Sequence, residues 1–518
     1  DATAAGGAAP GIAIDDASGL ATLLADVDLG SVWLDIEAAG DATVFVDALL
    51  DIASTRGTPS GRLAGTVRCD PILAAASLGL DIAALDGRFA DQADSLQRAA
   101  AAAPGLRVLS VSTSLWHACG ATAVDELALA LGGGVETLRR LESRGVDPAR
   151  AAQALSFQLT VDADIFASIA RLRAARLLWA RVLEACGIDA ATAPMHVAAT
   201  SPWRGRSRRD PWVNLLRGTT EAFAAAVGGA DVVAVLPFDS AVQGASALGR
   251  RVARNTQLLL QHEAHLARVA DPGAGSWTIE ALTDSLARAA WRRFQALEAA
   301  GGLPAALRSG RLATDLSAQA AARRARLASR REPLTGTSTT PNLEEAPLPS
   351  GTGAASPPPL GCFGLRPVRL DDDFDGLRAI SDARLATLGA RPRVFLCNLG
   401  AIPAHQMRAD FARHALAAVG FEAVGSDGFD SVAAAAAGFT ASGADGACIC
   451  ATDAAYAEST ESLAPALRAA GARFVLVAGR PGDHELAWRA AGIDTYVHMG
   501  CDVIALGRDL HELLEVVR

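Results

Sequence analysis

The chain has 518 residues, which is long enough for more than one domain. Half of the residues are apolar and 20% are charged, so most of the chain can bury a hydrophobic core. The net charge of −10 argues against a general nucleic-acid binder. The sequence holds no apolar run long enough for a transmembrane helix, so we expect no membrane partner.

The eight cysteines are scattered and predict buried thiols in a reducing cytosol: Cys69, Cys119, Cys186, Cys362, Cys397, Cys448, Cys450 and Cys501. Cys448 and Cys450 stand too close together for a usual zinc pair, and no second half follows, so no metal site is predicted. We find no signal peptide and expect a cytoplasmic protein. The first residue is Asp1 rather than Met, which suggests a truncated or processed start.

Residues 1–330 alternate between short apolar runs and alanine-rich amphipathic helices. The predicted strands are Ser31–Ile36, Leu63–Cys69, Arg107–Ser112, Ala154–Val161, Met195–Thr200, Val232–Pro237 and Leu266–Ala270. Helices are predicted between them, including Thr122–Leu131, Ile165–Cys186 and Arg250–His265. This alternation predicts a parallel sheet, and about seven such units predict a (β/α)8 barrel that lacks its first strand.

Residues 331–390 are predicted to connect two domains. Residues 331–358 are rich in Pro, Thr, Ser and Gly, which is typical of a linker or a surface wrap. The acidic run Asp371–Asp375 follows, and then a predicted helix, Asp375–Leu388.

Residues 391–518 repeat the strand–helix alternation on a smaller scale. The predicted strands are Arg393–Asn398, Glu422–Gly425, Ala447–Ala451, Phe474–Ala478 and Thr495–His498. The predicted helices are Ala404–Val419, Ser431–Ser442, Ser462–Ala470, His484–Ala491 and Asp502–Val517. This pattern predicts a flavodoxin-like doubly wound sheet, which binds ligands at the carboxyl ends of its strands.

Met195–Phe223 reads as a strand, a polar loop and a helix, and in a barrel its loop would lie on the catalytic face. Four arginines crowd this loop: Arg204, Arg206, Arg208 and Arg209. Guanidinium groups suit the phosphates of coenzyme A. However, Trp203 and Trp212 flank the loop, and tryptophan with arginine is a common interface combination. We therefore favour a subunit interface or a surface loop, and the role of these arginines stays open.

Several stretches resemble the methylmalonyl-CoA mutase family, the adenosylcobalamin-dependent acyl-CoA mutases. They are GATAVDELA at 120–128, RLRAARLLWA at 171–180, NTQLLLQHE at 255–263 and DPGAGSW at 271–277. They occur in the family's order, so the resemblance is specific. It implies an acyl-CoA barrel, a linker and a flavodoxin-like cobalamin domain.

The resemblance also implies where catalytic residues would stand. Active members carry His-(Ser/Thr)-Gln-Thr-(Ser/Ala)-Gly, whose histidine donates to the substrate's thioester carbonyl during radical rearrangement. Aligned on Thr200 and Ser201, this segment puts Val197 at the histidine position and Ala199 at the glutamine position. His196 is one residue away, which on a strand turns the side chain to the other face. We therefore interpret His196 as a core or surface histidine and predict no catalytic residue.

A second histidine falls at a family substrate contact. Active members have Tyr-His-(Met/Ile)-(Gln/Arg)-Glu-Ala-Gly, and the matching residues 114–120 here read SLWHACG. His117 stands at the polar contact, but Trp116 is beside it and the family's glutamate is missing. A packing role for His117 is favoured over ligand binding, which stays open.

The cobalamin motif of active members is Asp-x-His-x-x-Gly, in which the histidine binds cobalt and the aspartate orients it. Here His405 is present, but Pro403 replaces the aspartate and Arg408 replaces the glycine. The Arg480–Asp483 segment also adds bulk and charge where the cofactor's nucleotide tail would lie. His405 is therefore only a weak candidate ligand, better explained as a surface histidine, and no cofactor is predicted for this chain.

Together these losses resemble the small, non-catalytic subunits of heterodimeric enzymes in this family. Such a subunit pairs with a large one that binds adenosylcobalamin and interconverts methylmalonyl-CoA and succinyl-CoA in propionate metabolism. An alternative is an active acyl-CoA mutase with an unusual cobalamin site that uses His117 and His405. A third possibility, a binding protein that uses the flavodoxin-like domain without cobalamin, has no motif to support it.

Overall fold

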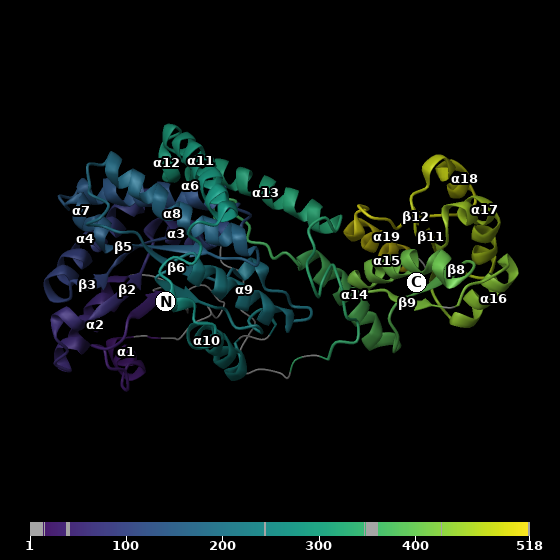
Figure 1. Ribbon diagram of the computed structural model, residues 1–518, viewed down its shortest axis with the longest axis horizontal. Helices are drawn as coiled ribbons and strands as arrows, with labels where there is room; N and C mark the ends of the chain where they lie inside the picture. Colours follow the sequence, from purple (N-terminus) through teal and green to yellow (C-terminus); the bar gives the residue numbers. More distant parts are fainter. Residues whose placement is uncertain are drawn as a thin grey trace. The chain divides into compact units, whose positions relative to one another are not determined.

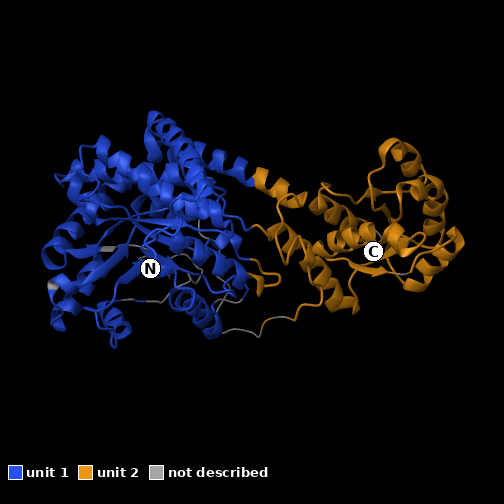
Figure 2. Cartoon of the chain, viewed as in Figure 1, with its two compact units in different colours: residues 1–206, 214–320, 350–369 blue, residues 207–213, 321–349, 370–518 orange. Residues whose placement is uncertain are grey.

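The computed structural model describes residues 14, 16–37, 42–242, 245–346, 348, 361–425 and 427–515. The chain divides into two compact units (Figure 2). Unit 1 comprises Asp1–Arg206, Asn214–Ala320 and Ser350–Arg369, and unit 2 comprises Ser207–Val213, Ala321–Pro349 and Leu370–Arg518. The second half of the arginine loop, Ser207–Val213, thus belongs to unit 2. Part of the predicted linker, residues 349–360, lies outside the described residues.

The strands described in unit 1 are all parallel and pair in chain order, as two sheets β1-β2-β3 and β4-β5-β6-β7 (Figure 1). They are β1 Leu34–Glu37, β2 Ala64–Arg68, β3 Gly105–Arg107, β4 Leu109–Ser112, β5 Leu155–Thr160, β6 His196–Thr200 and β7 Val232–Ala234. The predicted strand Arg107–Ser112 is interrupted at Val108 and becomes the end of β3 and all of β4.

The predicted strand Leu266–Ala270 is wrong. Leu266–Arg268 forms a single 3-10 turn after His265, whose φ of 55° places it in the left-handed region. No residue of this turn is buried. A short apolar run without a neighbouring strand has no partner for its backbone hydrogen bonds, so it turns instead.

Helices alternate with these strands in unit 1. Their bounds are α1 Ala17–Leu23, α2 Ala42–Thr55, α3 Pro71–Leu78, α4 Leu85–Ala102, α5 Ser114–Ala118, α6 Ala123–Glu142, α7 Pro148–Ala154, α8 Ile165–Ala185, α9 Val213–Val227, α10 Ala247–His262, α11 Trp277–Ala299, α12 Gly302–Arg308 and α13 Arg311–Ala328. The first residue of α9 and the residues of α13 from Ala321 onward belong to unit 2. Helix α6 begins with a capping box in which the Thr122 hydroxyl accepts from the Asp125 backbone N–H. Helix α11 packs on both α6 and α8.

Three successive glycines in the middle of α6 allow this close packing. A Cβ added at Gly134 would lie 2.6 Å from the ring of Trp179, which itself packs at 4.7 Å, centroid to centroid, on Phe157 of β5. Glycine costs stability inside a helix, but here it lets α6 approach the aromatic core of unit 1.

Unit 2 contains a five-stranded parallel sheet of order β12-β11-β10-β8-β9. Its strands are β8 Arg393–Asn398, β9 Glu422–Gly425, β10 Gly446–Cys450, β11 Val475–Val477 and β12 Thr495–Tyr496. In chain order this is 2-1-3-4-5, which is the flavodoxin-like order. All the strands predicted in this part of the chain are therefore confirmed.

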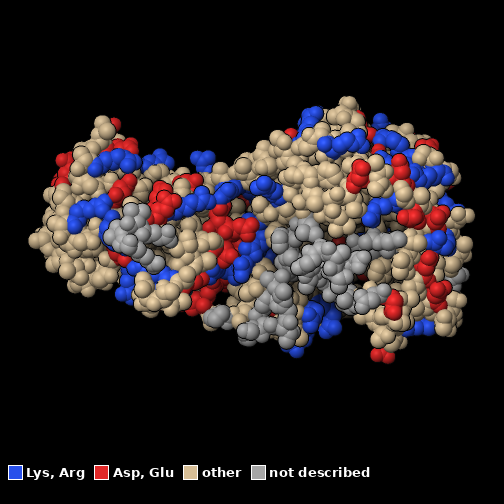
Figure 3. Space-filling view, turned by 180° about the vertical axis from the view of Figure 1, so that it is seen from behind, with Lys and Arg blue, Asp and Glu red and all other residues tan. Residues whose placement is uncertain are grey.

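The helices of unit 2 are α14 Asp372–Leu388, α15 Ile402–Ala418, α16 Val432–Ser442, α17 Asp453–Ala469, α18 Glu485–Ala490 and α19 Val503–Glu515. The predicted helix Ser462–Ala470 begins too late, because α17 already begins at Asp453, where the side chain of Thr452 caps it. Over much of the face drawn in Figure 3, arginine and carboxylate side chains lie next to each other. No helix within the described residues combines the length and hydropathy needed to cross a bilayer.

Candidate functional site

A cavity of about 230 Å³ lies in unit 1 at the carboxyl ends of the strands. Several of its lining residues end a strand: Glu37 in β1, Arg68 in β2, Thr160 in β5, Thr200 in β6 and Ala234 in β7. The strands of each of the two sheets are parallel, and the carboxyl ends of strands from both sheets meet at this cavity. His117 of α5 and Trp203 also line the cavity.

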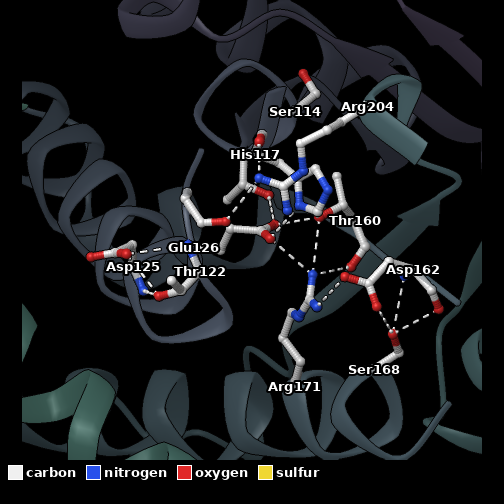
Figure 4. A network of polar contacts seen from close by, with 12 residues as sticks. Ser114, His117, Thr122, Asp125, Glu126, Thr160, Asp162, Ser168, Arg171 and Arg204 are labelled. Carbon is white, nitrogen blue, oxygen red and sulfur yellow. Dashed lines mark hydrogen bonds and ion pairs between the residues drawn. The ribbon is translucent and has the colours of Figure 1, made fainter. Parts of the chain in front are cut away.

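A cluster of buried polar side chains lies at the wall of this cavity (Figure 4). The Nδ1 atom of His117 is 2.6 Å from Oε1 of Glu126 on α6 and 2.8 Å from the hydroxyl of Thr160. Arg171 of α8 donates from Nη1 to Oε1 of Glu126 at 2.9 Å. None of the three ionisable side chains exceeds 3% exposure, so their charges and hydrogen bonds are satisfied by one another within the protein.

The protonation states follow from this geometry. Burial lowers the pKa of His117 to about 4, and the nearby charge of Arg204 acts in the same direction. Burial alone would raise the pKa of Glu126, but Arg171 and His117 beside it lower the pKa to about 2. At neutral pH the imidazole is therefore uncharged, and its Nδ1–H donates to the Glu126 carboxylate. Such a neutral imidazole is a poor general acid, because its remaining N–H is much less acidic than the N–H groups of an imidazolium ion.

This cluster was not predicted as a site, although two of its members stand in the sequence stretches that carry the family resemblance. Glu126 belongs to the 120–128 stretch and Arg171 begins the 171–180 stretch. The sequence did hold a signal for this cluster, since each of these two helices has a charged residue on its core-facing stripe. Charged residues are rarely buried unless they are paired, so two of them on such stripes suggest a buried pair.

The structure also places the predicted positions on β6. Val197 and Ala199 are fully buried in the hydrophobic core, opposite Phe157 and Leu159 of β5. Thr200, which lines the cavity, shares the other face with His196. His196 and Val197 thus point to opposite faces of β6, as the sequence suggests, and Val197 is the residue that faces the hydrophobic core.

His196 nevertheless lies at the amino end of β6, away from the cavity lining. Its Nδ1 is 3.0 Å from the hydroxyl of Ser156, and its ring stacks on Trp33 at 5.1 Å. Burial lowers the pKa of His196 to about 4. A neutral, stacked imidazole at this end of the strand has a structural role.

The arginine loop is divided between the units. In unit 1, Arg204 donates to the backbone oxygen of His117 at 2.6 Å, and Arg206 pairs with Glu221. Both arginines are buried, so they do not form the solvent-facing or interface loop that the sequence suggested. The buried carboxylate and carbonyl groups around them make this burial possible.

In unit 2, Arg209 bridges two carboxylates of α14. Its Nε is 2.7 Å from Oδ1 of Asp375, and its Nη1 is 2.6 Å from Oδ2 of Asp382. Arg208 is about half exposed, and its Nη1 lies 3.4 Å from Oδ2 of Asp375. The loop arginines are thus engaged by the chain's own acidic residues.

In the flavodoxin-like sheet, His405 lies near the start of α15, with Pro403 in the helix's first turn. The expectation of a surface histidine is wrong, because His405 is only 4% exposed. Its ring packs beside the backbone of Gly428, and Nδ1 has no hydrogen-bond partner among the described residues.

Side chains also fill the space at the carboxyl ends of β10 and β11. The Tyr456 hydroxyl accepts from the Ala451 N–H at 3.0 Å and donates to the Ala478 carbonyl at 2.7 Å. The guanidinium of Arg408 lies 4.9 Å from the Tyr456 ring centroid and pairs with Asp453 at 2.6 Å. This end of the sheet is therefore bridged and covered by its own residues.

The chain is a parallel α/β protein with a cavity of mixed polar and apolar lining at the strand ends of unit 1 and a flavodoxin-like sheet in unit 2. The sequence model described as methylmalonyl-CoA mutase matches residues 2–350. The chain belongs to the methylmalonyl-CoA mutase family, which confirms the resemblance seen in its sequence.

Three relatives show the extent of the similarity. The chain is 43% identical over 489 residues to the methylmalonyl-CoA mutase small subunit of Streptomyces virginiae, which covers 94% of this chain and 77% of that protein. It is 32% identical over 487 residues to the small subunit of Propionibacterium freudenreichii subsp. shermanii, covering 93% and 74%. It is 43% identical over 387 residues to the probable small subunit of Mycobacterium tuberculosis, covering 73% of this chain but only 60% of that protein.

Proposed function

We propose that this chain is the non-catalytic small subunit of a cytoplasmic methylmalonyl-CoA mutase. It would support, as one half of a heterodimer, a large subunit that binds adenosylcobalamin and interconverts methylmalonyl-CoA and succinyl-CoA. The observation that carries the proposal is the His117–Glu126 pair, in which a histidine that lines the cavity and a buried carboxylate satisfy each other. The small-subunit names of the most similar relatives support it. The chain-ordered parallel strands favour a TIM-type (β/α)8 barrel for unit 1.

A radical acyl-CoA mutase needs a proton donor at the substrate's thioester carbonyl. In the cavity of unit 1 the His117 Nδ1 proton is held by Glu126, and the positions matched to the family's catalytic pair are the core residues Val197 and Ala199. This supports a barrel that keeps its fold without its chemistry, because fold and site are separable.

The residues at the strand ends of unit 2 do not fit a corrinoid. Pro403 has no acceptor that could orient the imidazole of His405, which is itself buried. Arg408 and Tyr456 occupy the space where a nucleotide tail would have to enter the sheet. These contacts support a chain that binds no cobalamin itself.

One observation favours the second candidate, an active mutase with an unusual cobalamin site. His405 Nδ1 is buried without a hydrogen-bond partner among the described residues, and a free imidazole nitrogen is the group that a cobalt ion would take.

Visible absorbance after incubation with adenosylcobalamin distinguishes the two candidates. We expect the purified chain to remain colourless alone and the complex with a large subunit to hold one corrinoid per heterodimer. Activity should require the large subunit. Uptake of one corrinoid by this chain alone, lost in His405→Ala but kept in His414→Ala, would overturn the proposal. His414 is a matched control because it is an exposed histidine on the same helix.

A further inference from the structure

Helix α10 is held only weakly by unit 1. Of its 16 residues, only Gly249 is buried. Figure 1 draws α10 away from α6, α8 and α11, which pack on one another. An isolated helix of about this length is marginal in water, and most helices in proteins are stabilised by packing of an apolar face.

The outward surface of α10 combines leucines and arginines. Leu248, Leu258 and Leu259 are 43%, 44% and 50% exposed. Arg251, Arg254 and Leu258 follow an i, i+3, i+7 spacing and so share one stripe of the helix. Leu248 and Leu259 lie about three turns apart on a neighbouring stripe. We call these five residues the α10 face.

The charge of the α10 face is unusual for this chain. Helix α10 contains three arginines and no Asp or Glu, whereas the whole chain has a net charge of −10. Neither Arg251 nor Arg254 forms an ion pair with any residue that the structure describes. Arg209, in contrast, is engaged by two carboxylates. The α10 face is therefore positively charged, apolar in part and uncompensated.

We infer that the α10 face is the docking surface for the large mutase subunit, through an acidic patch that contains apolar residues. This inference rests on the proposed function. Interface cores combine apolar side chains with arginine, and complementary charge guides the encounter between two partners.

A second copy of this chain fits the α10 face less well. A twofold interface would bring the face against itself and place Arg251 and Arg254 opposite the same arginines. A membrane surface fits less well too, because helices that lie on bilayers separate their apolar and cationic faces. Here Leu258 lies in the same stripe as the two arginines.

The test compares variants of the full chain for binding to the large subunit. We expect the double variant Arg251→Glu/Arg254→Glu to raise the dissociation constant at least about ten-fold and to reduce its dependence on salt. Leu259→Ser should also weaken binding. Leu177→Ser on α8 is the matched control, because Leu177 is 56% exposed and lies outside the α10 face. Circular dichroism and thermal melts confirm that each variant is folded.

Each outcome has one interpretation. Equal dissociation constants for the wild type and the variants would overturn the inference and leave the proposed function intact. A wild-type chain that forms no complex with the large subunit would overturn both. If the wild type associates with itself and the double variant does not, the α10 face binds a second copy of the chain instead. If the wild type cosediments with phosphatidylglycerol vesicles and the double variant does not, the α10 face binds a membrane instead.

Discussion

The Nδ1 atom of His117 and the Oε1 atom of Glu126 lie 2.6 Å apart, and both side chains are almost completely removed from solvent. Because Arg171 also binds this carboxylate, the cluster is electrically balanced only while Glu126 is ionised.

Removing the Glu126 charge should therefore destabilise unit 1. We expect Glu126→Gln to lower the free energy of unfolding by about 3–5 kcal/mol, because the buried Arg171 would lose its nearest anion and keep only the partly exposed Asp162, 3.4 Å away. Urea unfolding measures the difference. Glu184→Gln is the control, since both partners of the Arg181–Glu184 pair are mostly exposed and such pairs contribute about 1 kcal/mol or less. Equal losses for the two variants would show that the cluster is not a buried charge network.

The same cluster predicts a dependence of stability on pH. Folding lowers the pKa of His117 from 6.5 to about 4. Between these two pH values the unfolded chain therefore binds a proton on His117 that the folded chain does not. Stability should therefore fall as the pH decreases from about 6.5 to about 4.

His117→Gln should remove the contribution of one proton from the dependence of the free energy of unfolding on pH, which reduces the slope by about 1.4 kcal/mol per pH unit. His196, whose pKa is also lowered to about 4, and Asp70, whose pKa burial raises to about 6, remain in both proteins. The difference between the two slopes therefore isolates His117. Urea unfolding at a series of pH values provides the slopes, and identical slopes would mean that His117 is charged in the folded protein.

Two neighbouring arginines should differ in their effect on unit 2. Arg209 is mostly buried and binds both Asp375 and Asp382, so Arg209→Ala should cost about 2 kcal/mol, between the values for exposed and fully buried pairs. Arg208→Ala should cost less than about 1 kcal/mol, because its side chain is half exposed and its ion pair is long. Hydrogen exchange of the α14 amides reports the difference. Faster exchange in Arg208→Ala than in Arg209→Ala would contradict it.

Two glycines in helices should respond to alanine with opposite signs. In Gly134→Ala the new methyl group would meet the Trp179 ring, and we expect a loss of about 1–3 kcal/mol from overpacking. In Gly87→Ala on α4 the methyl group meets nothing within 4 Å, and better helix propensity should add up to about 1 kcal/mol. Thermal melts of both variants give the two signs, and stabilisation by Gly134→Ala would refute the close approach of α6.

Sequence periodicity located most of the strands. Arg393–Asn398 has the predicted bounds, because a buried strand of a parallel sheet is a short apolar run between turns. Glu422–Gly425 also has the predicted bounds, although this edge strand is only partly buried. Leu266–Ala270 has the same composition but no neighbouring strand, and a pattern within one segment cannot reveal that.

The polar cluster could not be predicted in the same way. Glu126 is 9 residues from His117 and 45 from Arg171, so their meeting depends on how α5, α6 and α8 pack. The burial of His405 depends similarly on the approach of Gly428 from a distant loop. Residue type indicates which groups can form a site, whereas tertiary packing decides which of them meet.

The hydroxyl of Tyr456 connects the chain after β10 to the chain after β11 at the carboxyl ends of these two neighbouring strands. A ligand stabilises a protein only when it binds the folded state. On the proposed function, in which this chain binds no cobalamin, we expect the amount of the chain in the cell to be independent of the supply of this cofactor.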